Sequence, residues 1–107
     1  MKQYTTPEQT AKLIELGFEE PKSIRYPKNE EEAERVDSID FLISDYSIGE
    51  LIAMLPDDGV ADRRLEFDGF HWFVDWDSFD KIRQTMGVEL VDALYDMIVK
   101  LKKEGVI

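Results

Sequence analysis

The chain has 107 residues, of which 43% are hydrophobic and 11% aromatic, and this length and composition suit one folded domain over residues 1–107. Thirteen basic and 24 acidic side chains give a net charge of −11, which disfavours direct binding to nucleic acid or to an anionic membrane. The chain has no cysteine, which excludes disulfides, thiolate metal sites and thiol nucleophiles.

The sequence shows no targeting signal and no membrane span. Residues 1–10 are polar and lack the basic start and apolar run of a signal peptide. No apolar run approaches the roughly 20 residues that are needed to cross a bilayer. Because cysteine is also absent, we expect a cytoplasmic protein that does not bind membranes.

The first predicted helix covers about residues 7–16. Thr6 suits its N-cap, Pro7 suits the first helical position, and Gln9 can complete a capping box with Thr6. Gly17 is typical of the left-handed residue that follows a helix. The start and the end of this helix are therefore both marked in the sequence.

The next part of the chain contains weaker signals. Residues 19–35 predict a solvated loop or a short exposed helical turn, because they contain two prolines and an acidic run at 29–34. Apolar and polar side chains then alternate, which predicts a strand over about residues 38–43.

A second capping box predicts a helix over about residues 48–55. Ser47 can accept a hydrogen bond from the amide of Glu50, whose side chain can reach back to Ser47. Apolar residues follow at helical spacing, and Pro56 ends the helix.

Asp68 and Gly69 are typical of a two-residue turn, so they predict a β-hairpin over about residues 63–76. In the register that this turn implies, Phe67 faces Phe70 and Glu66 faces His71. One face of the hairpin is then apolar and holds Leu65, Phe67, Phe70, Trp72, Val74 and Trp76. The other face holds Arg64, Glu66, His71, Phe73 and Asp75.

Residues 77–87 allow two interpretations. Ser78 could cap a helical turn that holds Phe79 and Ile82, or the segment Lys81–Met86 could form a third strand. The last helix is the clearest element and covers about residues 88–103, with an apolar stripe at spacings of three and four. Its stripe consists of Leu90, Leu94, Met97, Ile98 and Leu101, widened by Val91 and Tyr95. Gly105 marks its end.

These elements predict an α+β fold. A small antiparallel sheet is built on the hairpin at about residues 63–76, and residues 38–43 are a candidate additional strand. Three helices, at about residues 7–16, 48–55 and 88–103, pack on the apolar face of the sheet. The predicted core consists of Leu13, Leu51, Leu55, Phe67, Trp72, Leu94, Ile98 and Leu101.

Asp75, Asp77 and Asp80 form one cluster that could bind a metal, because carboxylates at alternate positions can bind calcium or magnesium. An EF-hand loop that began at Asp75 would need Gly where the chain has Asp80 and Glu where it has Met86. We therefore expect a strand end with solvated acids and predict neither a metal nor another cofactor. A metal-dependent reaction at this cluster is the alternative to a protein without enzymatic activity.

His71 is the only histidine, and Glu66 faces it in the predicted register. Glu66 could orient His71 as a general base, but no nucleophile is implied nearby. A solvent-facing cross-strand pair explains the same residues and would raise the pKa of His71. We therefore predict no catalytic residue.

Phe73 is exceptional because the predicted register leaves it on the polar face of the hairpin. We therefore predict that Phe73, His71 and Asp75 contact a partner, with coverage of Phe73 by the region Asn29–Glu34 as the alternative. The aromatic residues of this strand could instead stack on bases, but acidic neighbours oppose that interpretation and favour core packing for the two tryptophans.

Two stretches resemble a family of small uncharacterised proteins found in gut bacteria and in their phages and mobile elements. The first is Tyr46–Pro56, an aromatic-Ser segment followed by Leu51, Leu55 and Pro56. The second is the C-terminal helix, with Asp92-Ala93, Met97-Ile98, Lys100-Leu101 and Val106-Ile107. The resemblance covers the second half of the chain and implies a short accessory protein of a phage or integrated element, with no functional residue to transfer.

Two functions are compatible with the acidic charge. The favoured one is a non-enzymatic interaction module that binds a protein partner of basic character. The alternative is an acidic DNA mimic that inhibits a nucleic-acid-binding protein. A mimic should compete with DNA for its target, and its binding should weaken steeply with salt.

Overall fold

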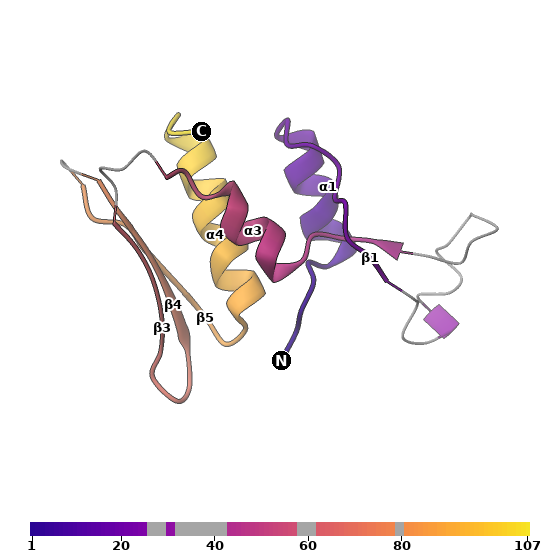
Figure 1. Ribbon diagram of the computed structural model, residues 1–107, viewed down its shortest axis with the longest axis horizontal. Coiled ribbons are helices and arrows are strands. Elements are labelled where there is room, and N and C mark those ends of the chain that lie inside the picture. The colour runs from indigo at the N-terminus through magenta and orange to yellow at the C-terminus, as the bar shows by residue number, and fades with distance from the viewer. Residues whose placement is uncertain (26–29, 32–42, 58–61, 79–80) are drawn as a thin grey trace.

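The C-terminal helix α4 (Leu90–Lys103) packs against a β-sheet and against helix α3 (Ile48–Met54) (Figure 1). The computed structural model describes residues 1–25, 30–31, 43–57, 62–78 and 81–107. The other elements are helix α1 (Pro7–Glu15), the antiparallel strands β3 (Asp62–Phe67), β4 (Trp72–Asp77) and β5 (Gln84–Gly87), and a ribbon of β1 (Ile24–Arg25) and β2 (Ile43–Ser44). The predicted α+β class is confirmed, and the three helices and the hairpin lie close to their predicted positions.

The buried face of α4 is the stripe that the sequence predicts. Its buried residues are Leu90, Val91, Ala93, Leu94, Met97, Ile98 and Leu101. Full burial of one leucine-sized side chain contributes about 1.5–3 kcal/mol, so this stripe supplies much of the driving force for folding. The helix begins two residues later than predicted, with Glu89 as its N-cap. It ends as predicted, because Gly105 has a φ of 77° and the Val106 amide donates to the Leu101 carbonyl at 2.9 Å.

Both predicted capping boxes are present and explain where α1 and α3 begin. The Thr6 hydroxyl accepts from the Gln9 amide at 3.1 Å, and the Gln9 side chain accepts from the Thr6 amide at 2.9 Å. Ser47 and Glu50 make the equivalent bonds at 3.1 and 3.2 Å. Caps of this kind typically contribute about 1 kcal/mol each. Gly17, with a φ of 100°, follows α1 as predicted.

The hairpin of β3 and β4 is present, but its predicted register is wrong by two residues. Phe67 pairs with Trp72 rather than with Phe70, so residues 68–71 connect the strands. The Asp68 carboxylate explains the wider turn because it accepts hydrogen bonds from two amides of the connection, at 2.8 and 2.6 Å. A shift of two residues leaves every strand side chain on its predicted face, because side chains alternate with a period of two.

Strand β5 decides between the two interpretations of residues 77–87, because it pairs antiparallel with β4 and makes β4 the central strand. The Thr85 hydroxyl donates to the Ala93 carbonyl at 2.6 Å and so joins β5 to α4. A Cβ at Gly87 would lie 3.2 Å from the Glu89 carbonyl oxygen and 3.3 Å from the Ala93 nitrogen. Glycine at this position therefore permits the close approach of the sheet to the helix.

The predicted strand at residues 38–43 lies outside the described residues except for Ile43. Ile43 pairs with Arg25 in the separate β1–β2 ribbon, so β2 does not extend the hairpin sheet as expected. In the acidic run at 29–34, Glu30 and Glu31 are helical and exposed.

Six of the eight predicted core residues are buried, and the two exceptions lie on the hairpin. Phe67 is 54% exposed and was wrongly placed in the core, whereas Trp72 is half-buried with its ring centre 4.9 Å from that of Phe67. The reason is the position of α4, which packs on β4 and β5. Strand β3 lies beyond them at the edge of the sheet, and all of its residues are exposed (Figure 1).

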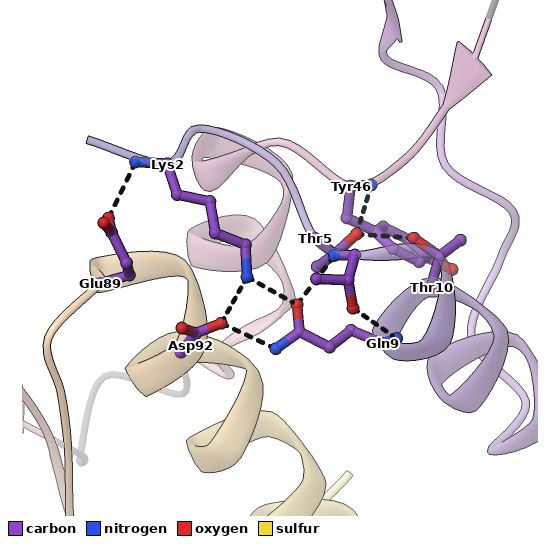
Figure 2. Close-up of polar contacts among 8 residues, drawn as sticks. Lys2, Thr5, Gln9, Thr10, Tyr46, Glu89 and Asp92 are labelled. Atoms are coloured by element: carbon purple, nitrogen blue, oxygen red, sulfur yellow. Dashed lines mark hydrogen bonds and ion pairs between the residues drawn. The ribbon is translucent and has the colours of Figure 1, made fainter. Parts of the chain in front are cut away.

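Polar contacts join the N-terminal segment to the first turn of α4 (Figure 2). Asp92 accepts from the Lys2 ammonium at 2.7 Å and from the Gln9 amide group at 2.8 Å. The Lys2 backbone amide also donates to Glu89 at 2.8 Å. Burial would raise the pKa of Asp92, but the hydrogen bonds from Lys2 and Gln9 and the charge of Lys2 outweigh it and lower that pKa.

A buried polar network joins the N-terminal segment and α1 to the start of α3 (Figure 2). Thr10 donates its hydroxyl to Asp45 at 2.6 Å and lies 2.7 Å from the hydroxyl oxygen of Thr5. The Thr5 hydroxyl in turn accepts from the Tyr46 amide at 3.0 Å. Because buried polar groups are costly without partners, this network fixes how the N-terminal segment lies on the core.

Replacement of Leu94 by Ala should lower the free energy of unfolding by about 2–5 kcal/mol, because Leu94 is fully buried in the centre of the α4 stripe. Ile14→Ala on α1 is the control variant. The Ile14 side chain is 40% exposed, so this replacement should lower the free energy of unfolding by less. Denaturant titration of both variants measures the difference. Equal losses would contradict the packing described above.

Replacement of Lys2 by Met should lower the melting temperature at neutral pH, because it removes the ammonium that faces Asp92. The lowered pKa of Asp92 stabilises the fold above the ordinary aspartate pKa of about 3.9, and this contribution disappears as the pH falls through the folded value. The difference from wild type should therefore shrink in acid. Lys22→Met is the control, since its ion pair with Glu19 is exposed and long at 3.7 Å.

Candidate functional site

The face of the sheet that is turned away from α4 is the candidate site, and we call it the outer sheet face. Val74 and Trp76 of β4 are buried in the core cluster with α4. Their neighbours along the strand therefore point the other way, because side chains alternate across a sheet. The strand residues of the outer sheet face include Phe73 and Asp75 of β4 and their partners in register, which are Met86 and Gln84 of β5 and Glu66 and Arg64 of β3.

Apolar side chains on and beside the outer sheet face are exposed. Phe73 is half-buried and pairs in register with Met86, which is 55% exposed. Ile82 and Val88, which flank β5, are 82% and 69% exposed. Exposed apolar side chains that are grouped on one face are typical of an interaction surface. The other large exposed apolar residues of the sheet are Leu65 and Phe67, on the face that bears α4, and Phe70, in the connection of β3 and β4.

Asp75 and Asp77 already have partners within the protein. Asp75 is almost completely buried and accepts from the Gln84 amide group at 2.8 Å. Asp77 accepts from the Arg83 amide at 3.2 Å and lies 3.8 Å from the Arg64 guanidinium. Among the residues that the structure describes, no three histidine or acidic side chains are grouped so as to hold a metal, and Asp80 lies outside those residues.

His71 does not form the predicted pair with Glu66. Glu66 lies opposite Phe73, because the register differs from the predicted one by two residues. His71 precedes β4 in the connection, where its amide donates to the Asp68 carboxylate at 2.6 Å and its carbonyl accepts from the Asp68 amide at 3.1 Å. His71 is therefore part of the hydrogen-bonded turn that connects β3 and β4.

A hollow of about 380 Å³ lies between α3 and the segment that follows α1. Its lining is Phe18, Glu19, Glu20, Lys22, Tyr46, Glu50, Ala53 and Met54. Glu50 holds the backbone here, since it accepts from the amides of Lys22 at 2.8 Å and Ser23 at 3.1 Å. Burial would raise the pKa of Glu50, but these and other hydrogen bonds lower it. Glu50 is therefore an anionic hydrogen-bond acceptor in the fold.

Sequence reasoning placed Phe73 and Asp75 on this face of the sheet but missed its β5 half. Ile82, Gln84, Met86 and Val88 alternate with residues that face the core or α4, and this period of two was the available signal. Because this segment is short and ends in glycine, its sequence is equally compatible with a turn. Pairing with β4 is what gives these residues a common face.

No protein-family model, curated protein or solved structure matches this chain. No helix in the described segments is long and apolar enough to span a bilayer. A functional proposal for the chain therefore depends on its own surfaces.

The Asp68 carboxylate, which shapes the connection beside the outer sheet face, should titrate below the ordinary aspartate pKa. Hydrogen bonds from the amides of His71 and Phe70 are the largest causes that lower the pKa of Asp68. The amide proton shifts of these two residues, followed by NMR, should therefore change with a midpoint below about 3.9.

The same bonds stabilise the turn above the unfolded-state pKa of Asp68 and are lost as the pH falls through the lower folded value. An Asp68→Asn variant is the control and should abolish the titration. A midpoint at or above 3.9 in wild type would contradict the hydrogen-bonded turn.

Proposed function

We propose that this chain is a non-enzymatic protein–protein interaction module that binds its partner through the outer sheet face. The observation that carries the proposal is the exposure of Met86, Ile82 and Val88 around the half-buried Phe73. Apolar side chains that are exposed together on a regular strand lose contact with water when a partner covers them.

The charge of the chain defines the chemistry of this partner. A net charge of −11 attracts a basic protein and repels acidic ones. The apolar residues of the outer sheet face supply contact area, and acidic residues near it, among them Asp77 and Glu66, favour basic side chains at the rim. A role as an accessory protein of a phage or mobile element fits a small module of this kind.

The described residues favour binding over catalysis on the outer sheet face. The buried carboxylate of Asp75 is bonded to Gln84, and Asp77 accepts from the Arg83 amide. Glu66 is opposite Phe73 and does not orient His71, and the Asp68 carboxylate beside His71 accepts the backbone amides of the turn. A general base also needs a nearby nucleophile, and the sequence implies none for His71.

The double variant Ile82→Gln and Met86→Gln should weaken capture of the partner at least about tenfold, because it removes exposed apolar contact without changing charge or chain length much. The measurement is quantitative mass spectrometry of proteins retained from source-cell lysate on the immobilised chain. Ile14→Gln on α1 is the matched control and should retain the partner, and circular dichroism verifies that each variant is folded.

Capture at about 0.05 and 0.15 M salt distinguishes this proposal from a DNA mimic. The Debye length shortens over that range, so the electrostatic binding of a mimic should weaken steeply. Retention of the partner at higher salt and its loss in the double variant support the proposal. A DNA-binding protein that is released by salt, displaced by DNA and unaffected by the double variant would contradict it and favour mimicry.

A further inference from the structure

Strand β3 exposes a regular edge of the sheet. Within the described part of the chain it pairs with β4 alone, and each of its residues is exposed. It contains neither proline nor glycine, the residues that commonly interrupt the pairing of an edge strand. An uninterrupted edge of this kind is a template for a further strand.

The hydrogen-bonding groups of this edge follow from two observed bonds. The Asp68 amide donates to the His71 carbonyl at 3.1 Å, so Asp68 and every second residue before it in β3 face β4. On the far side of β4, the Trp76 amide donates to the Arg83 carbonyl at 3.0 Å, which is consistent with the same alternation. The β3 residues whose amides and carbonyls face the free edge are Arg63, Leu65 and Phe67.

We infer that this edge pairs with the β3 edge of a second copy of the chain, antiparallel and around a two-fold axis at Leu65. A two-fold axis perpendicular to the sheet keeps each side chain on its own face. Leu65 then lies opposite Leu65, and Arg63 lies opposite Phe67 of the second copy. The free amides and carbonyls of these residues meet as hydrogen-bonded pairs.

Charge selects this register among those that the backbone permits. With the axis at Leu65, Arg64 of each copy lies opposite Glu66 of the other, at a non-hydrogen-bonded position where side chains are close. Shifting the axis by one residue sets either Arg64 opposite Arg64 or Glu66 opposite Glu66, which is repulsive. The strand is thus complementary to itself in one register.

The strip of the sheet that α4 leaves uncovered gives the pairing an apolar component. Leu65 is 39% exposed and Phe67 is 54% exposed, and both lie on the face that bears α4. Leu65 also lines a groove of about 190 Å³ together with Ile52, Leu55 and Arg63. Because the two-fold axis keeps both α4 helices on one side of the joined sheet, the exposed apolar residues of the two β3 strands meet in its centre.

The local charge also permits association of two acidic chains. Asp62 and Glu66 balance Arg63 and Arg64, so β3 is neutral within a chain of net charge −11. At about 0.15 M salt the Debye length is about 8 Å, which screens the remaining charges of the two copies while the paired strands stay in contact. This inference concerns the β3 edge and is independent of binding at the outer sheet face.

Analytical ultracentrifugation of the full chain at about 0.15 M salt tests the inference. Wild type should sediment as a dimer with twice the 12.5 kDa chain mass at high concentration. Arg64→Glu and Glu66→Arg should each raise the dissociation constant at least about tenfold, because each places like charges opposite one another at both symmetric positions.

An equimolar mixture of these two variants should restore the dimer, because every Glu then faces an Arg across the axis. Glu15→Arg on α1 and Lys100→Glu on α4, both at exposed positions outside the sheet, are the matched controls and should dimerise like wild type. Thermal melts verify folding, which Arg64→Glu should retain because the Arg64 side chain is exposed and its ion pair with Asp77 is long at 3.8 Å. A monomeric wild type, or a mixture that stays monomeric, would overturn the inference.

Discussion

Burial of the apolar stripe of α4 is the interaction on which the rest of the structure depends. The stripe is covered by β4 and β5 and by α3, so the sheet and the helices are placed by their contacts with one helix. Polar contacts secure both ends of that helix. Lys2 and Gln9 bind Asp92 in its first turn, and Arg83 of the segment before β5 binds Glu104 at its C-cap at 3.1 Å.

The position of α4 also determines which surfaces remain available. Because α4 lies over β4 and β5, none of the described helices covers the inner face of β3, and Phe67 and Leu65 are exposed. The side of the sheet opposite α4 has no described helix packed on it, which exposes Met86 beside Phe73. The position of α4 therefore leaves two exposed apolar surfaces, for which we propose a foreign partner and a second copy of the chain.

Charge gives these two surfaces different characters. The chain as a whole is strongly acidic, so a partner that covers the outer sheet face gains from basic groups at its rim. Strand β3 is locally neutral, and its Arg64 and Glu66 complement each other across a two-fold axis. Long-range repulsion between acidic chains therefore opposes self-association least at this edge.

The sequence by itself determined the helices, their capping boxes at Thr6 and Ser47, and the face of each hairpin residue, because these depend on local hydrogen bonds and on the period of apolar residues. It did not determine the hairpin register, the role of β5 or the exposure of Phe67. The register depends on how the Asp68 carboxylate binds two turn amides. The exposure of Phe67 depends on which strands α4 covers. That choice depends on packing between segments that are distant in the sequence, so local sequence patterns do not determine it.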